Sequence, residues 1–174
     1  MQRHIILVPY KEEWAQEYKK EAGRISHVLH PVLSAIHHIG STAIPGILAK
    51  PTIDILAEVT DLEQVDSLAS GIERLGYQSY GEYGISGRRY FCKTDAMGNH
   101  LVHLHVFREE TENVIRHLAF RDYLKVHDDD ADFYSRLKEE LAVAFPYDGE
   151  SYSKGKDAAV HKIEERALQW WYGE

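Results

Sequence analysis

The segment 37–55 contains residue types that bind phosphate and metal ions. It reads His-His-Ile-Gly-Ser-Thr-Ala-Ile-Pro-Gly and, after three further residues, continues as Lys-Pro-Thr-Ile-Asp-Ile. A glycine lets the backbone approach a phosphate closely, and the hydroxyl and amide groups after it can donate hydrogen bonds to the phosphate oxygens. We therefore interpret Gly40, Ser41 and Thr42 as candidate phosphate-binding residues, with Lys50 as an additional positive charge.

Asp54 is the one acid among Ile53, Ile55 and Leu56 in a run that predicts a buried strand. A carboxylate at such a position is costly to bury unless it is paired or binds a metal ion. Taken alone, an acid in a strand can also cap a neighbouring loop, and a Gly-Ser pair is usually an ordinary turn. It is the order and spacing of the two features that favour a functional site.

Two histidines, His103 and His105, stand two residues apart in a second predicted strand. Side chains at i and i+2 of a strand share a face, so both rings can reach one metal ion or one phosphate. The alternative is that one ring packs in the core and the other hydrogen-bonds a neighbour. His37 and His38 point to opposite faces of their strand, so at most one of them faces the same cleft.

Arginine and lysine side chains elsewhere in the chain are further candidates for contacting an anion. Arg88 follows a glycine-rich loop and can either bind phosphate bidentately or form a structural ion pair at the sheet edge. We interpret Arg121 and Asp122 as a helix-packing ion pair. Lys154 and Lys156, near the start of the last helix, are interpreted as solvated, with a ligand-facing lysine as the alternative.

The order of hydrophobic patterns predicts an α+β fold, with a mixed sheet in the first two thirds and a helical C-terminal third. Asp61 is the predicted N-cap of a helix that ends at Gly76. The other expected elements are a short strand or entry segment at 5–8, a helix from 11 that stops at Pro31, strands at 35–39, 52–59, 88–94 and 101–107, and three helices after 111.

Composition places the chain among ordinary globular proteins. The 174 residues fit a single domain spanning 1–174, and the formal net charge is −8. An acidic surface lacks the basic footprint of a domain that binds duplex nucleic acid, and no run is long enough to span a membrane. Cys92 is the only cysteine, so it cannot form an internal disulfide. We expect a cytoplasmic protein.

The motif that begins at His38 resembles the signature of the GrpB family, and the resemblance extends over essentially the whole chain. The family is similar in fold to the polymerase-β-type nucleotidyltransferases. The matching residues are His38 to Thr42, Pro45-Gly46, Lys50-Pro51, Ile53 to Ile55, Gly76-Tyr77, Gly81-Glu82, Gly84-Ile85, Arg88, His103 to His105, Phe120 to Leu124, Tyr152 and Lys156.

The resemblance implies a metal-dependent site in which the protein departs from the usual pattern of acids. In those transferases a strand after a Gly-Ser pair carries two acids one residue apart, and a neighbouring strand carries a third. Here Asp54 matches the first acid, Leu56 stands at the position of the second, and His103 and His105 lie on the expected third-acid strand. The expected metal ligands are Asp54, His103 and His105. Glu58, about 13 Å further along the strand, is a weak substitute.

Three functions are compatible with these residues. The first is metal-assisted nucleotidyl transfer to an unknown acceptor, with Asp54 and Ser41 as catalytic residues and Mg²⁺, Mn²⁺ or Zn²⁺ as the ion. The second is an inactive ligand-binding or regulatory module linked to coenzyme A-type metabolism, because similar proteins occur fused to dephospho-CoA kinase domains. The third is a His/Asp transition-metal hydrolase. In each case the expected partner is a small-molecule nucleotide or a phosphorylated metabolite.

Overall fold

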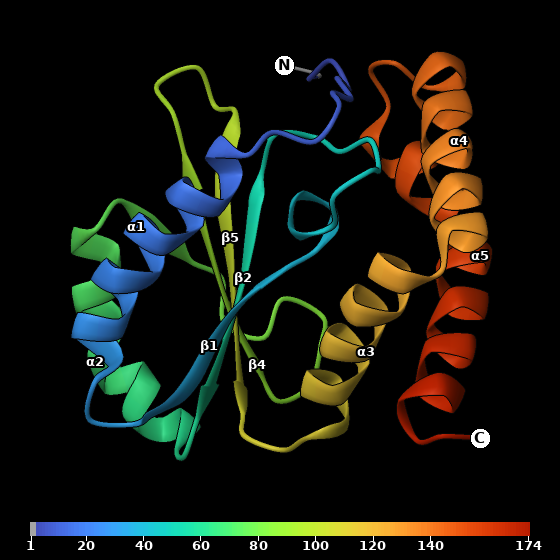
Figure 1. Cartoon of the computed structure of the whole chain (residues 1–174). Helices are drawn as coiled ribbons and strands as arrows, with labels where there is room; N and C mark the ends of the chain where they lie inside the picture. Colours follow the sequence, from blue (N-terminus) through green and yellow to red (C-terminus); the bar gives the residue numbers. More distant parts are fainter. Residues whose placement is uncertain (1–2) are drawn as a thin grey trace.

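Five strands form one mixed sheet through the middle of the protein (Figure 1). The computed structural model describes residues 3–174. The strand order is β1-β2-β5-β4-β3; β2 and β5 are parallel, and the other neighbouring pairs are antiparallel. The strands are β1 (Leu33–Ile39), β2 (Ile53–Val59), β3 (Tyr77–Ser79), β4 (Arg88–Thr94) and β5 (His100–Arg108).

Helices cover both faces of this sheet. In Figure 1, α1 (Glu13–Leu29) and α2 (Leu62–Arg74) lie on one side of it. The three C-terminal helices lie on the opposite side, so the fold is α+β as the sequence predicts. These helices are α3 (Glu112–Val126), α4 (Asp128–Ala144) and α5 (Gly149–Trp171), and a short 3₁₀ turn, Ser41–Ala43, follows β1.

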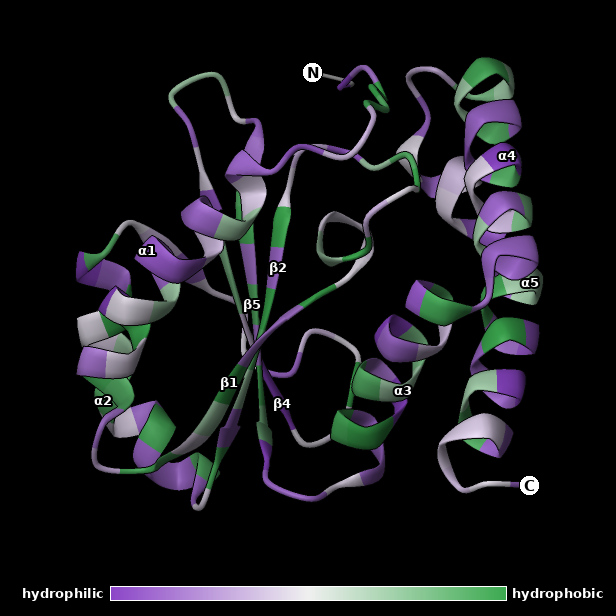
Figure 2. Cartoon of the chain, viewed as in Figure 1, coloured by the Kyte–Doolittle hydropathy of each residue, from purple (hydrophilic) through white to green (hydrophobic). Residues whose placement is uncertain are grey.

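The two faces of β2 differ in polarity because side chains alternate along a strand. Ile53, Ile55 and Ala57 are buried in the core under α1 and α2. Asp54 and Leu56 point to the other face, toward the C-terminal helices. Figure 2 shows hydrophobic and hydrophilic segments following one another along β2, in agreement with this alternation.

A second hydrophobic core forms on the side of the C-terminal helices. Ile44 and Ile47, from the loop after the 3₁₀ turn, are fully or almost fully buried in it. The loop between β1 and β2 is therefore anchored on α3, α4 and α5, and it connects these helices to the sheet. The remaining buried members are Ala119, Tyr123, Leu124, Ala131, Tyr134, Ile163 and Ala167.

The predicted helices and the four long strands are confirmed, with small differences in their limits. Asp61 caps α2 as predicted, and its carboxylate accepts hydrogen bonds from the amides of Glu63 and Gln64. Of the two interpretations of 5–8, a short strand or an entry segment, the structure has the second, because only Val8 pairs there, through an isolated bridge to Ala49. The short strand β3 was not predicted, since three residues are too few to show a period of two.

Two further features bear on the site and on the class of protein. Phe133 of α4 is 54% exposed, whereas the buried face of this helix carries Ala131, Tyr134 and Lys138. Within residues 3–174, no helix has both the length and the apolar composition that crossing a membrane requires.

Candidate functional site

Asp54 lies in a row of residues that crosses the sheet. In the strand register, Ile39 of β1 pairs with Asp54, Asp54 pairs with His103 of β5, and His103 pairs with Cys92 of β4. Asp54 Oδ1 is 3.3 Å from His103 Nδ1 and 3.3 Å from His105 Nε2. The sequence predicted that these three residues form a group, and the parallel pairing of β2 with β5 places them together.

The charges of this group stabilise one another. Partial burial opposes ionisation of Asp54, but hydrogen bonds and positive charge from His103 and His105 outweigh it and hold the pKa of Asp54 well below its usual range. Burial likewise opposes protonation of His103, yet the hydrogen bond to Asp54 raises the pKa of His103 to about 9. A carboxylate that stays ionised beside two imidazoles is a ligand set suited to a divalent cation.

Gly40 is required for the backbone to pass close to Asp54. Its φ is +72°, and a Cβ added there would lie 2.6 Å from Asp54 Oδ2. From the sequence, this glycine was expected to make room for a phosphate. In the structure it also makes room for the carboxylate, so the turn after β1 and the acid of β2 pack directly together.

The residues after Gly40 face two different partners. Ser41 Oγ accepts a hydrogen bond from Lys138 Nζ at 2.9 Å, which brings the turn to α4. Thr42 is buried, and its Oγ1 lies 2.9 Å from His38 Nε2. Burial lowers the pKa of His38 to about 4, so that ring is neutral. The Thr42 side chain thus helps to shape the turn, while Ser41 stands at its edge.

Three lysine ammonium groups gather beside the turn. Burial, with the positive charges of Lys156 and Lys50, lowers the pKa of Lys138 to about 7. Lys156 has its pKa lowered to about 8, again first by burial and then by Lys50. Lys50 Nζ and Lys156 Nζ each lie 5.0 Å from the centre of the Tyr152 ring. An anion between these groups would relieve their mutual repulsion.

Lys138 was not among the residues predicted from the sequence, although the sequence contains a signal for it. It follows Ala131 and Tyr134 at spacings of three and four residues, and all three are buried on one face of α4. A lysine within such an apolar stripe is unusual, because buried lysines need a partner. Its partners are Ser41 Oγ and the Leu48 carbonyl oxygen, 97 and 90 residues away in the sequence.

Arg88 supports the loop before β4. It is 7% exposed, donates hydrogen bonds to the carbonyl oxygens of Glu82 and Tyr83, and its guanidinium lies over the ring of Tyr90. One guanidinium nitrogen is 3.4 Å from His105 Nδ1. Within residues 3–174 the guanidinium forms no ion pair: its hydrogen bonds go to backbone carbonyls, and it contacts the site through His105.

The second-acid position of β2 is closed to ligands. Leu56 is fully buried and packs in an apolar cluster with Ile39 and Phe107. Glu58 lies four residues further along β2 than Asp54 and pairs with His37, with 2.6 Å between Oε2 and Nε2. Asp54 is consequently the acid that β2 contributes to the site.

Two other charged residues have the structural settings that the sequence favoured. Arg121 pairs with Asp122 at 2.7 Å and donates a hydrogen bond to the His38 carbonyl, which ties α3 to β1. Lys154 is exposed and pairs with Glu150 at 2.7 Å. Of the two lysines at the start of α5, Lys156 is the one beside the turn.

Hollows on the surface of α4 contain none of these residues. Their volumes are about 450 and 430 Å³, and both are lined by Arg136 and Glu140. The candidate site is therefore defined by its converging polar groups between the sheet and the C-terminal helices, and not by these hollows.

Comparison with known proteins identifies the family of this chain. A family model described as "GrpB protein" matches residues 4–166. The chain belongs to the GrpB family. It is 40% identical over 171 residues to the UPF0157 protein YqkA of Bacillus subtilis, which covers 98% of this chain and 49% of that protein. The chain thus spans about half the length of this relative.

Solved structures extend the comparison to the fold. The crystal structure of conserved protein GrpB from Enterococcus faecalis superposes with a TM-score of 0.91 and 38% identity, covering 96% of this GrpB chain and 99% of that one. The Cid1 poly(U) polymerase bound to MgATP superposes with a TM-score of 0.53 and 10% identity over 78% of this chain and 44% of that one. The fold is that of the polymerase-β-type nucleotidyltransferases.

Proposed function

We propose that this GrpB chain binds a nucleotide or another phosphorylated metabolite at the Gly40–Ser41 turn, and that a divalent metal ion at Asp54 assists nucleotidyl transfer to an acceptor. The observation that carries this proposal is the convergence of Lys50, Lys138 and Lys156 beside Ser41. In a protein of net charge −8, three neighbouring lysines, each with its pKa lowered first by burial, support a local site for an anion.

Two contacts near the turn support a triphosphate with its metal ion as the ligand. Lys138 and Ser41 contact each other directly, and Asp54 packs against the adjacent Gly40. Lys138 and Ser41 would hold phosphate oxygens, and Asp54 would hold the ion. The Cid1 structure with MgATP, which shares the fold, supports a nucleotide as the first ligand class to test.

The residues around Asp54 fit a metal ion with a preference for nitrogen ligands. Asp54, His103 and His105 each offer one ligand atom, and these atoms lie within 4.8 Å of one another. One carboxylate and two imidazoles suit Mn²⁺ or Zn²⁺ better than Mg²⁺, which prefers oxygen ligands. When bound, the ion would polarise a phosphoryl oxygen. The same ligand set also supports a transition-metal hydrolase as an alternative activity.

In the proposed reaction, an acceptor oxygen forms a bond to the α-phosphorus of a nucleoside triphosphate. The bond from that phosphorus to the bridging oxygen breaks, pyrophosphate leaves, and the acceptor releases one proton. The residues of this chain bind and orient: Ser41 and the amides after Gly40 contact phosphate oxygens, and Lys138 and Lys156 balance the charge of the leaving group.

A binding module without turnover is the second candidate. It is favoured by Leu56, because the second carboxylate of active transferases is replaced by a fully buried apolar side chain. The two candidates share the ligand site and differ in whether pyrophosphate is released.

The test is a thermal-shift panel of nucleoside triphosphates and coenzyme A precursors with Mg²⁺, Mn²⁺ or Zn²⁺. A ligand at a hundred times its dissociation constant adds about 2.7 kcal/mol, and each kcal/mol raises the midpoint by about 2–4 °C. We expect a shift for the wild type that is lost in Lys138→Met and becomes metal-independent in Asp54→Ala. Lys154→Met removes the same charge from an exposed lysine, and we expect it to keep the full shift.

Equal shifts for Lys138→Met and Lys154→Met would refute the phosphate site. If the ligand binds, a pyrophosphate-release assay with candidate acceptors then separates the transferase from the binding module. Pyrophosphate release by the wild type that is absent in Asp54→Ala supports the transferase.

A further inference from the structure

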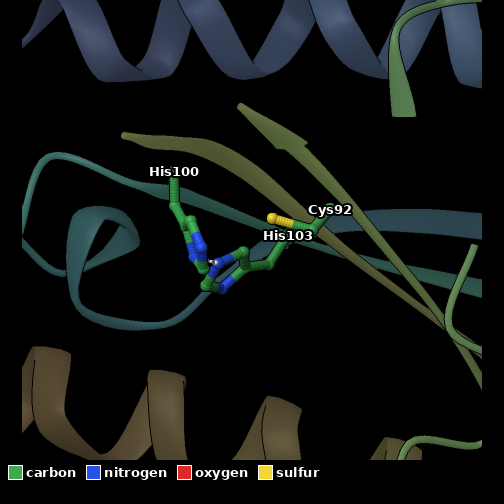
Figure 3. Close-up of side chains that lie close together, drawn as sticks. All are labelled: Cys92, His100 and His103. Atoms are coloured by element: carbon green, nitrogen blue, oxygen red, sulfur yellow. Dashed lines mark hydrogen bonds between the residues drawn. The ribbon is translucent and has the colours of Figure 1, made fainter. Parts of the chain in front are cut away.

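A second group of metal-ligating side chains lies on the β4 side of His103. Cys92 comes from β4, and His100 and His103 come from β5; in Figure 3 the sulfur and the two rings point toward one another. Cys92 pairs directly with His103 across the two strands, so their side chains emerge on the same face. One ligand atom from each of the three lies within 4.8 Å of the others.

We propose that Cys92, His100 and His103 bind a zinc-type transition-metal ion, with water in the fourth position of a tetrahedral site. Thiolate and imidazole are the ligands that zinc takes most often, and three protein ligands with one open position is a recurring zinc arrangement. A thiolate ligand favours Zn²⁺ over Mg²⁺. This site would therefore select Zn²⁺ more strongly than the Asp54 group, which has a carboxylate in place of the thiolate.

The distances are close to those of a bound ion. Zinc–sulfur and zinc–nitrogen bonds of about 2.3 and 2.0–2.1 Å place tetrahedral ligand atoms about 3.3–3.6 Å apart. His100 Nδ1 and His103 Nε2 are 2.7 Å apart, so an ion would open this hydrogen-bonded pair slightly. The sulfur of Cys92 lies within 4.8 Å of a nitrogen of each ring, so it would move by about 1 Å at most, which side-chain rotation can supply. Cys92 is 5% exposed, and the sulfur is therefore shielded from solvent oxidants.

His103 connects this site to Asp54 through its two ring nitrogens. Nε2 faces His100, whereas Nδ1 lies 3.3 Å from Asp54 Oδ1. With an ion on Nε2, Nδ1 carries the proton and donates to the carboxylate. A carboxylate behind a metal-bound histidine fixes the orientation of the ring and raises its basicity. Asp54 then acts on the ion through His103, as a positioning residue.

This arrangement makes the two metal positions exclude each other at His103. An ion bound at Asp54 through His103 Nδ1 requires the proton on Nε2, and an ion on Nε2 requires it on Nδ1. A thiophilic ion at Cys92 would therefore leave Asp54 and His105 as the remaining ligands of the other position. The inference goes beyond the proposed function, since it needs no nucleotide and names a different ion class and ligand set.

The experiment uses the full chain without a histidine tag, stripped of metal and kept reduced with a phosphine. Co²⁺ is titrated as a spectroscopic probe for the zinc position, and metal content is measured after Zn²⁺ loading. We expect one ion per chain and a thiolate-to-cobalt charge-transfer band in the near ultraviolet. The band should disappear in Cys92→Ser, and His100→Asn should weaken binding at least tenfold.

Two further variants separate the sites. Asp54→Asn should keep the charge-transfer band but weaken Zn²⁺ binding about 10- to 100-fold, as expected for loss of the carboxylate behind a ligating histidine. His105→Gln removes a ligand of the Asp54 group only and should keep the thiolate band. His161→Gln changes an exposed histidine outside both groups and should bind Co²⁺ like the wild type. His100 lies at the end of β5 and is partly exposed, so its variant can be compared as a folded protein even if Cys92→Ser does not fold.

Absence of the thiolate band in the wild type would overturn the proposal. So would equal Co²⁺ affinity of the wild type and His100→Asn. A band that is lost in His105→Gln but kept in His100→Asn would place the ion with Asp54 instead. None of these outcomes depends on nucleotide binding, so failure here is distinguishable from failure of the proposed function.

Discussion

At the scale of single residues, the close contact between Gly40 and Asp54 decides how the site is built. A positive φ and a 2.6 Å approach of an added Cβ to a carboxylate oxygen both require glycine. The turn that was expected to hold phosphate is therefore coupled to the acid that was expected to hold metal. A side chain at position 40 would displace the Asp54 carboxylate from the turn and so affect the binding of both phosphate and metal ion.

We predict that Gly40→Ala lowers the free energy of unfolding by about 1–3 kcal/mol, from the strained backbone and the clash with Asp54. The displaced carboxylate should also lose its hydrogen bonds to His103 and His105. Urea denaturation measures the first effect, and NMR titration of the histidine rings measures the second. Gly98→Ala has a similarly positive φ with open space around the added Cβ, so it is the control for backbone strain alone. Identical behaviour of the two variants would contradict the coupling.

At the scale of elements, α4 and α5 supply the positive side of the site. Lys138 lies on the buried face of α4, and Lys156 lies in the second turn of α5 beside Tyr152. The helices are packed closely, since a Cβ at Gly155 would lie 2.4 Å from a methyl carbon of Leu141. Helix packing thereby places like charges together, at a cost in stability that a bound anion would offset.

A pH dependence of stability follows from this placement. The pKa of Lys138 is lowered to about 7 in the folded protein by burial and by the facing Lys156 and Lys50, against about 10.4 for an unfolded lysine. Between these values the unfolded chain binds more protons, so stability rises with pH. From pH 6 to pH 9, the wild type should gain about 2–3 kcal/mol relative to Lys138→Met.

Denaturant unfolding at the two pH values measures this difference, with Lys154→Met as the matched surface control. A constant gap between the wild type and Lys138→Met at pH 6 and pH 9 would show that Lys138 titrates normally in the folded state.

At the scale of the whole molecule, the site lies between two separately packed cores. One core joins α1 and α2 to the sheet, and the other joins α3, α4 and α5 to the loop after β1. The loop and the Lys138–Ser41 hydrogen bond connect the two sides near the candidate site. A ligand that contacts Asp54 and the lysines together would add a further connection.

We predict that a phosphorylated ligand slows amide hydrogen exchange in α4 and α5 more than in α1 and α2. The reason is that α4 and α5 gain contacts to the ligand through Lys138 and Lys156, while the core under α1 and α2 is unchanged. Exchange followed by mass spectrometry on the free and liganded protein measures the effect. Equal protection on both sides of the sheet would indicate ligand binding elsewhere or a uniform gain in stability.

Much of the fold was predictable because periodic patterns report local structure. The apolar period of α2 and its Asp61 cap needed only neighbouring residues. The Gly-Ser turn and the acid of the next strand were predictable for the same reason, since Gly40 and Asp54 lie at the two ends of the loop between β1 and β2. In contrast, β3 was missed because its three residues form a strand only by pairing with β4.

The sequence by itself determined the α+β class, the strand that carries Asp54 and the pair of histidines on one face, because strand and helix periods are local properties. Only the tertiary structure decided which groups meet at that face. The parallel pairing of β2 with β5 placed Asp54 beside His103, and helix packing brought Lys138 to Ser41 across 97 residues. Side-chain periodicity shows which face a residue occupies, whereas its distant partner depends on how the elements pack.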